Sequence, residues 1–454
     1  MHTTIDTSVQ PAKIPSAAPT EKYYRLFRTH ADQAKIVTAT TKAFLDGIEM
    51  FAGRECREQC EKAGLGKLHL HYPAEHVGLL EAYVNEQVKR LAIEWTAAVG
   101  RHDVGLEHEF LVQDLLIVRV HYPHGHLGQS TTISTRQPSL RHRIRYGFAS
   151  AMERIKDSYT SPSAFRLPGH VLKYVQQRRK RAALPLPYRC HASHMDSWLG
   201  QPITSLSVWL GISGLDQNNG LCIYPDTMGV PLPVDGSKFL GSGFLLPKPI
   251  RPEIHDGDLF VFCTDMLHSS QLNVSDKTRI ALTTRIDPGT PVFSDESLWF
   301  VERWYSGESI LSGRWRRVKV SSEHRVPRTK PTGQRADRSV DIPSVFSKDQ
   351  EYRVAASDQI RENDSFAVQF QNKRIMILRT KGALKAFSAL CPHAGYRMDD
   401  GFHDACTVIC PGHGLEFDIQ TGQSALKRYR LEPFQVSERD GAVYLGSPAS
   451  ARTT

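Results

Sequence analysis

Two pairs of cysteine and histidine near the C-terminus constrain this chain more than any other feature of its sequence. Cys391-Pro-His393 and Cys410-Pro-Gly-His413 are separated by sixteen residues, and each lies in a predicted loop between strands. Two thiolates on one iron and two imidazoles on a second iron satisfy a mixed-ligand [2Fe-2S] cluster. Zinc also accepts two cysteines and two histidines, so the ligand types alone leave both metals open.

The residues around these loops distinguish between a [2Fe-2S] cluster and a zinc site. The stretches CPHAGYRMDDG and CPGHGLEFDIQTG resemble Rieske domains in spacing and in flanking residues, and the resemblance extends from about Phe346 to Leu445. It implies a [2Fe-2S] cluster with four ligands, which are Cys391, His393, Cys410 and His413.

The same resemblance implies a low reduction potential. In high-potential Rieske proteins a disulfide joins the two loops, whereas the matching positions here are Tyr396 and Gly412. Hydroxyl groups that donate hydrogen bonds to the cluster sulfurs are replaced by Leu415 and Phe417. Fewer hydrogen bonds leave the more negative, reduced cluster less stabilised, so we expect a ferredoxin-type potential.

A second set of candidate metal ligands lies in the middle of the chain. His194-Met-Asp196 follows an irregular loop, and His268 comes 72 residues after Asp196, beyond the predicted strand DLFVFC. Two imidazoles and one carboxylate can occupy one face of an iron(II) ion and leave three positions open. Arg279, eleven residues after His268 on the next predicted strand, offers a guanidinium that can bind a dicarboxylate in bidentate fashion.

The central region resembles the phytanoyl-CoA dioxygenase-like branch of iron(II) and 2-oxoglutarate-dependent oxygenases. The matching stretches are SHMDSW, SLSVWLGISGLDQNNGLCIYP and HDGDLFVFCTDMLHSSQLNVSDKTRIALTTR, and the resemblance covers about Gly169 to Arg285. The resemblance implies three iron ligands, which are His194, Asp196 and His268. It also implies that Arg279 and Ser270 hold the distal carboxylate of 2-oxoglutarate and that Gln177 makes a further cosubstrate contact.

The periodicity along the chain predicts a mixed, mostly β fold. Apolar residues recur at helical spacing over residues 31–63 and 74–99, and short β-type runs of a sandwich or barrel follow Gly105. With the resemblance, this pattern implies a double-stranded β-helix (jelly roll) with scaffold helices and a separate small all-β domain. We expect a flexible tail at residues 1–20, an oxygenase domain at 21–320, a basic linker at 321–344 and a Rieske domain at 345–450.

The net charge of +9 does not indicate a nucleic-acid partner. Nine basic and two acidic residues between Arg314 and Arg338 contribute +7, without a recognised nucleic-acid-binding motif. We expect this segment to extend the domain junction or to guide an acidic redox partner. No apolar run is long enough for a membrane helix and the N-terminus lacks the apolar core of a signal peptide, so we expect a soluble, cytoplasmic protein without membrane contact.

The predicted function is a dioxygenase that uses iron(II), 2-oxoglutarate and O₂ to hydroxylate or otherwise oxidise a small organic molecule, by resemblance in secondary metabolism. The Rieske domain would transfer electrons to the iron from a ferredoxin or an NAD(P)H-dependent reductase. One alternative is a reductase-driven monooxygenase that does not consume 2-oxoglutarate, and another is a non-catalytic electron-transfer protein. We interpret the HYPHGH segment, with His121, His124 and His126, as a loop or pocket wall, with substrate contact as its alternative.

Overall fold

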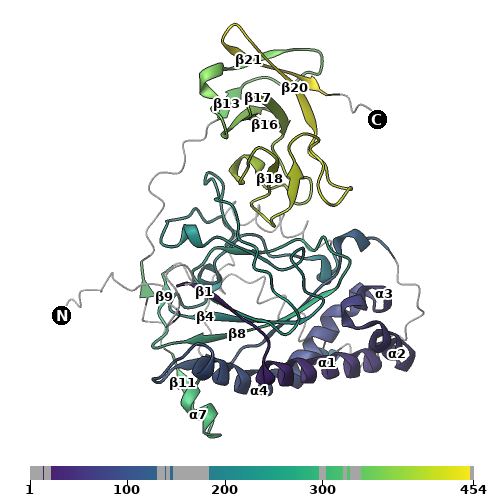
Figure 1. Cartoon of the computed structure of the whole chain (residues 1–454), viewed down its shortest axis with the longest axis vertical. Coiled ribbons are helices and arrows are strands. Elements are labelled where there is room, and N and C mark those ends of the chain that lie inside the picture. The colour runs from purple at the N-terminus through teal and green to yellow at the C-terminus, as the bar shows by residue number, and fades with distance from the viewer. Residues whose placement is uncertain are drawn as a thin grey trace, which may run out of the picture.

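The computed structural model describes residues 14, 22–129, 139, 144–146, 184–295, 303–320, 325–327 and 339–449. Gln177 lies outside these residues. Figure 1 shows a larger body of helices and sheets and, above it, a smaller β-rich body formed by the C-terminal part of the chain.

Helices cover one side of the larger body, as the periodicity predicts. They are α1 (Ala31–Ala52), α2 (Arg54–Ala63), α3 (Leu68–His71), α4 (Val77–His102) and the short α7 (Gly307–Leu311). The long helices α1 and α4 pack against each other below the large sheet (Figure 1). Gly47 permits this approach, because a Cβ there would meet the Leu80 and Tyr83 side chains at 2.7 and 2.8 Å. Among the described helices, none combines the length and apolar character needed to cross a bilayer.

The core of the larger body is an eight-stranded sheet with the order β1-β6-β4-β8-β2-β10-β11 and with β3 also paired to β8. Its strands are β1 (Tyr24–Phe27), β2 (Leu111–Gln113), β3 (Ile117–His121), β4 (Leu206–Ser213), β6 (Leu259–Cys263), β8 (Arg279–Asp287), β10 (Arg303–Ser306) and β11 (Arg317–Lys319). All its pairings are antiparallel, which agrees with the predicted sandwich or barrel pattern. The jelly-roll topology itself stays a prediction.

Two short pairs complete the larger body. β5 (Leu221–Ile223) pairs with β7 (His268–Ser270), and β9 (Phe293–Ser294) pairs in parallel with β12 (Arg325–Val326). The first of these pairs positions the candidate iron ligands, because β7 begins at His268.

The C-terminal body is a seven-stranded sheet that nearly closes into a barrel, with the order β13-β15-β16-β17-β20-β21-β14. Its strands are β13 (Ser339–Ile342), β14 (Tyr352–Ala356), β15 (Ser365–Phe370), β16 (Lys373–Thr380), β17 (Ala383–Ser388), β20 (Pro433–Arg439) and β21 (Ala442–Pro448). A separate hairpin consists of β18 (Thr407–Ile409) and β19 (Glu416–Asp418). β13 falls inside residues 321–344, where the sequence predicts a linker, and it pairs in parallel with β15.

Candidate metal centres and their junction

A two-residue antiparallel bridge holds the candidate iron ligands His194 and His268 side by side. The backbone N–H of each residue donates to the carbonyl oxygen of the other, at 2.8 and 2.9 Å. Residues directly opposite each other in an antiparallel pair point to the same face, so both imidazoles lie on one side of the bridge. Their ring centroids are 4.4 Å apart.

Backbone carbonyls select the tautomer of both imidazoles. Nδ1 of His194 lies 2.6 Å from the carbonyl oxygen of Ala192, and Nδ1 of His268 lies 2.9 Å from that of Met266. A carbonyl can only accept, so Nδ1 carries the proton and Nε2 keeps its lone pair for a metal. Burial lowers the pKa of His268 to about 4, which keeps this ring neutral at physiological pH.

Two neighbouring side chains hold one oxygen of the Asp196 carboxylate, Oδ2. Oδ2 accepts hydrogen bonds from the Ser207 hydroxyl at 2.6 Å and from Nη2 of Arg285 at 3.0 Å, while Oδ1 lies 3.8 Å from Nε2 of His194. Burial alone would raise the pKa of Asp196, but Arg285 and the two histidines hold it well below its usual range. The group is therefore an anion with one oxygen directed toward the imidazoles.

The three side chains fit a mononuclear iron(II) ion. Their ligand atoms all lie within 4.8 Å of one another, and all three residues are buried. Two neutral imidazoles and a carboxylate on one side of a metal form the facial arrangement that leaves positions open for substrates. Ser207 and Arg285 were not predicted from the sequence, although Arg285 lies six residues after Arg279 and therefore on the same face of β8.

Arg279 lies at the start of β8, opposite His121 of β3. Its guanidinium donates through Nη1 to the carbonyl oxygens of Asn219 and Gly220, at 2.7 and 2.8 Å. The side chain is 2% exposed, burial lowers its pKa to about 10, and it forms no ion pair with any carboxylate of the described residues. Ser270 shares β7 with His268, two residues away and so on the same face.

The two C-terminal loops have the same backbone geometry. In each loop the cysteine N–H donates to the carbonyl oxygen five residues later, and the residue four positions later donates to the cysteine carbonyl oxygen; these distances lie between 2.8 and 3.0 Å. Backbone N–H groups of His393 and Ala394 hydrogen-bond to the Cys391 sulfur, and those of Gly412 and His413 to the Cys410 sulfur. The loops thus form two matching turns whose backbone N–H groups lower the pKa of each thiol, although burial, the largest effect on Cys410, holds the pKa of that thiol well above its usual range.

The four side chains of these turns gather at one place. Cys391 and Cys410 are hydrogen-bonded through their sulfur atoms, which lowers the pKa of Cys391. The ring centroids of His393 and His413 are 5.0 Å apart. Two adjacent thiols next to two adjacent imidazoles match the division of ligands that a [2Fe-2S] cluster needs.

A family model described as Rieske [2Fe-2S] domain matches residues 350–431. The C-terminal part of this chain is a Rieske domain. The match supports the cluster over zinc, and it does not extend into the larger body.

Solved structures resemble this domain as well. The ferredoxin of carbazole 1,9a-dioxygenase from Nocardioides aromaticivorans IC177 is 27% identical, with 21% of this chain and 97% of that chain covered and a TM-score of 0.21. The terminal oxygenase of carbazole 1,9a-dioxygenase from Novosphingobium sp. KA1 is 22% identical, with 23% and 31% covered and a TM-score of 0.21. A ferredoxin of Sphingomonas yanoikuyae B1 is 24% identical, with 22% and 100% covered and the same TM-score.

The Rieske domain has an aromatic contact where high-potential relatives are expected to have a disulfide. A Cβ at Gly412 would lie 2.5 to 2.8 Å from ring atoms of Tyr396, so the Tyr396 ring packs directly on Gly412. Leu415 and Phe417 are buried in the apolar core next to the cluster loops and have no hydroxyl to donate. The ferredoxin-type potential itself stays a prediction.

The second loop of the Rieske domain lies against the iron-ligand loop. The backbone N–H of Ser193 donates to the carbonyl oxygen of Gly412 at 3.0 Å, and the Ser193 hydroxyl donates to that of Pro411 at 2.5 Å. The N–H of Leu272 donates to the carbonyl oxygen of His413 at 3.1 Å. We call this contact between the two metal-binding loops the junction.

His124 extends the junction to the first Rieske loop. Its Nε2 lies 2.6 Å from the hydroxyl of Tyr429, and its ring centroid lies 5.2 Å from that of His393. Burial lowers the pKa of His124 to about 3, with His393 and Arg428 adding to the effect. The HYPHGH segment, interpreted from the sequence as a loop or pocket wall, places His124 between the two domains.

Close packing around Gly414 completes the junction. Nη2 of Arg251 donates to the Gly414 carbonyl oxygen at 2.7 Å, and its Nη1 pairs with Glu416 at 2.7 Å. Gly414 has a φ of +65°, and a Cβ there would lie 2.5 Å from the sulfur of Cys222. Only glycine fits this position without displacing one domain from the other.

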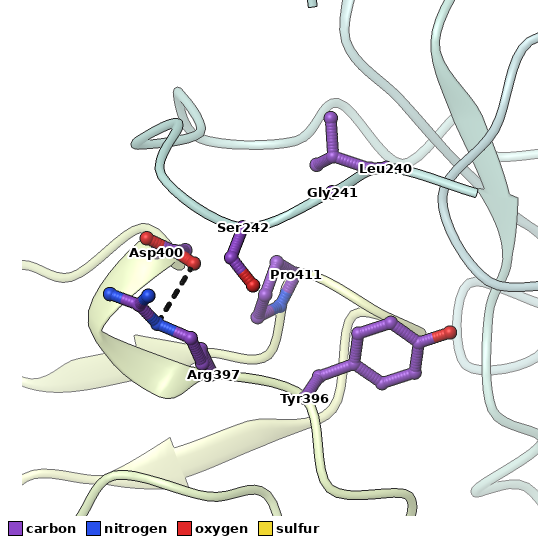
Figure 2. Close-up of a pocket in the computed structure, with 7 residues that line it drawn as sticks. All are labelled: Leu240, Gly241, Ser242, Tyr396, Arg397, Asp400 and Pro411. Atoms are coloured by element: carbon purple, nitrogen blue, oxygen red, sulfur yellow. Dashed lines mark ion pairs between the residues drawn. The ribbon is translucent and has the colours of Figure 1, made fainter. Parts of the chain in front are cut away.

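A small pocket opens at the edge of the junction (Figure 2). Its lining residues come from both domains and are Leu240, Gly241, Ser242, Tyr396, Arg397, Asp400 and Pro411. Asp400 accepts a hydrogen bond from the N–H of Gly243 at 3.2 Å and pairs with Nε of Arg397 at 3.3 Å. Burial raises its pKa to about 6.

Proposed function

We propose that this chain is an oxygenase with a mononuclear iron(II) site, and that its Rieske cluster supplies electrons to that site. The hydrogen bond from Ser193 to Gly412 carries the proposal, because Ser193 directly precedes the iron ligand His194 and Gly412 directly precedes the cluster ligand His413. This contact places the iron-ligand loop beside the second cluster loop, an arrangement that suits electron transfer between the two sites.

The iron(II) ion would supply open coordination positions at which O₂ and an organic cosubstrate can meet. The chain's own residues orient this site. The carbonyl oxygens of Ala192 and Met266 fix the imidazole tautomers, and the Ser207 hydroxyl fixes the Asp196 carboxylate. All three ligands are buried, so bulk water is kept away from the oxidising chemistry.

We further propose that the organic cosubstrate is 2-oxoglutarate. The buried guanidinium of Arg279 supports this, since a buried cation is unfavourable unless an anion compensates it, and no described carboxylate does so. A dicarboxylate could bind the metal at one end and Arg279 at the other, with the Ser270 hydroxyl as a second donor. Gln177 stays a prediction.

Oxidative decarboxylation of 2-oxoglutarate to succinate and CO₂, coupled to hydroxylation of a small organic substrate, already balances its electrons. The cluster held by Cys391, His393, Cys410 and His413 would therefore supply single electrons, which would return an iron ion held by His194, Asp196 and His268 to the iron(II) state after uncoupled turnover. A ferredoxin or an NAD(P)H-dependent reductase would reduce the cluster again.

Anaerobic reconstitution tests both parts of the proposal. The holoprotein should form succinate and a product heavier by one oxygen atom when 2-oxoglutarate, a substrate panel and O₂ are added, as measured by mass spectrometry. A His393→Ala variant should complete a single turnover started with iron(II), but its sustained turnover should be slower than that of the unmodified protein. Equal sustained turnover by both proteins without an external reductant would overturn the electron-supply role.

A second candidate is a reductase-driven monooxygenase that does not consume 2-oxoglutarate. The junction favours this candidate too, because it brings the cluster to the iron whatever the cosubstrate is. Product formation without succinate, dependent on reductant, would support it and overturn the role proposed for Arg279.

A further inference from the structure

We propose that a small acidic protein with a one-electron centre docks on the first Rieske loop and on a basic turn beside it. The docking surface consists of loop residues 390–395 and the basic turn formed by Lys427, Arg428 and Arg430. This proposal rests on the proposed function, because it gives the entry point of the electron that leaves the cluster through the junction.

The two cluster loops differ in their access to solvent. In the second loop, Pro411, Gly412 and His413 are all buried against the larger body. In the first loop, Pro392, Ala394 and Gly395 are exposed and His393 is half-buried. Within the described part of the chain, the first loop therefore offers a partner protein access to the cluster, while the second loop is already occupied by the iron-ligand loop.

The basic turn lies directly beside the accessible loop. Tyr429, in the middle of the turn, has its ring centroid 5.5 Å from that of His393. Lys427, Arg428 and Arg430 flank Tyr429 and are exposed. None of these three cations forms an ion pair with any carboxylate in the part of the chain that the structure describes.

Apolar and charged parts of this surface complement each other. Leu390, which directly precedes Cys391, is 47% exposed and gives an apolar contact next to the cluster. Three uncompensated cations within four residues create a local positive potential, which attracts an acidic partner and orients it before contact. The chemistry of the step is a single electron transfer: the carrier's centre loses one electron and the oxidised cluster gains it, with no atom transferred.

Cluster reduction by a defined donor tests the proposal on the full-length, cluster-loaded chain. The probe is a reduced, acidic plant-type [2Fe-2S] ferredoxin, and the rate of cluster reduction is followed by anaerobic stopped-flow absorbance. We expect a Lys427→Glu, Arg428→Glu, Arg430→Glu variant to react about tenfold more slowly or worse at low ionic strength. High salt should slow the unmodified protein and remove most of this difference.

The matched control reverses the charge of three exposed basic residues near a second apolar core of the Rieske domain. Lys348, Arg353 and Arg361 are sequence neighbours of Phe346, Val354 and Ile360, which pack in a core separate from the cluster core. Their substitution by glutamate should leave the rate unchanged. Dithionite should reduce all three proteins equally well, and their reduced clusters should have the same electron paramagnetic resonance spectrum. These controls show that the cluster is intact in each variant.

Equal rates for the two triple variants, or a rate that does not fall with salt, would overturn the docking surface. Internal transfer is measured separately, by reducing the cluster with dithionite and following conversion of iron(III) to iron(II) at the mononuclear site. Loss of ferredoxin reactivity with intact internal transfer supports the docking surface, whereas failure of internal transfer in the unmodified protein contradicts the proposed function.

Discussion

Ser193 and Gly412 join the two metal-binding loops through one backbone hydrogen bond of 3.0 Å. The path from His413 to His194 therefore crosses two peptide links and this hydrogen bond, entirely within one chain. It needs no movement of either domain, so electron transfer at the junction should depend on how closely the two loops are held together.

Gly414→Ala should loosen that contact. The new Cβ would lie 2.5 Å from the Cys222 sulfur, and alanine at a φ of +65° adds about 1 kcal/mol of backbone strain. We expect transfer from the dithionite-reduced cluster to iron(III) to slow about tenfold or more, with an unchanged spectrum of the reduced cluster. Freeze-quench electron paramagnetic resonance would follow both sites.

A second substitution makes this test specific. Cys222→Ala removes the sulfur that the new Cβ would meet, so the double variant Cys222→Ala, Gly414→Ala should recover part of the lost rate. If the double variant is no faster than Gly414→Ala, displacement of the loops is not the cause.

Ser207→Ala should weaken metal binding without removing a ligand. The Ser207 hydroxyl donates to Oδ2 of Asp196 at 2.6 Å, and loss of such an outer hydrogen bond lowers metal affinity by about tenfold or more. Anaerobic titration with iron(II) measures this directly. Ser205→Ala is the matched control, since this buried hydroxyl donates to Asp287 and not to Asp196; equal losses in both variants would contradict the prediction.

Arg279→Gln should reduce 2-oxoglutarate affinity by roughly 100-fold, because a charged bidentate contact contributes about 3 kcal/mol. The Arg279 guanidinium lies 5.9 Å from the Trp209 ring, so tryptophan fluorescence of the iron-loaded protein offers a binding signal. The ligand-free variant should keep its thermal stability, since it no longer buries an uncompensated charge. A large loss of stability with unchanged affinity would indicate a purely structural arginine.

Ligand residues were easier to predict from the sequence than their surroundings. His194 with Asp196 and the ligands of each Rieske loop stand out by residue type and short spacing, while His268, 72 residues after Asp196, was assigned by family resemblance. The structure brings each set together. Helices α1, α2 and α4 followed from apolar periodicity, a local property.

The junction could not be predicted in this way. The contacts of Ser193 with Gly412 and of His124 with Tyr429 join positions more than 200 residues apart, and they depend on how two finished domains fit together. No periodicity encodes such a contact. Strand β13 was missed for a related reason, because Ser339–Ile342 follows a segment rich in arginine and proline that resembles a linker.

Phe417→Tyr should raise the reduction potential of the cluster. Phe417 is buried beside the cluster loops, and a hydroxyl there could donate a hydrogen bond to a cluster sulfur. Such a bond favours the reduced state, so we expect an upward shift of roughly 50 mV. A spectroscopic redox titration measures it, and a lower or unchanged potential would contradict the assignment of this position.

Asp400 should make the stability of the junction depend on pH. Its pKa rises from 3.8 to about 6 in the folded chain, so the folded state binds this proton more tightly than the unfolded state does. The stabilising contribution of Asp400 should be fully present below about pH 4, be lost progressively, by up to about 3 kcal/mol, as the pH rises to about 6, and change little above that. Urea unfolding followed by cluster absorbance measures this as the difference in unfolding free energy between the protein and its Asp400→Asn variant; a difference that stays constant between pH 4 and pH 6 would refute the prediction.

The placement of both metal-binding loops in a single polypeptide has a kinetic consequence. When a cluster and its acceptor reside on separate proteins, delivery requires a collision and its rate falls with dilution. Here the second Rieske loop already rests on the iron-ligand loop, so the local concentration of the donor is set by the covalent chain and not by expression level. Electron transfer to the iron should therefore be first order and independent of protein concentration. Only the re-reduction of the cluster should depend on the concentration of the electron carrier.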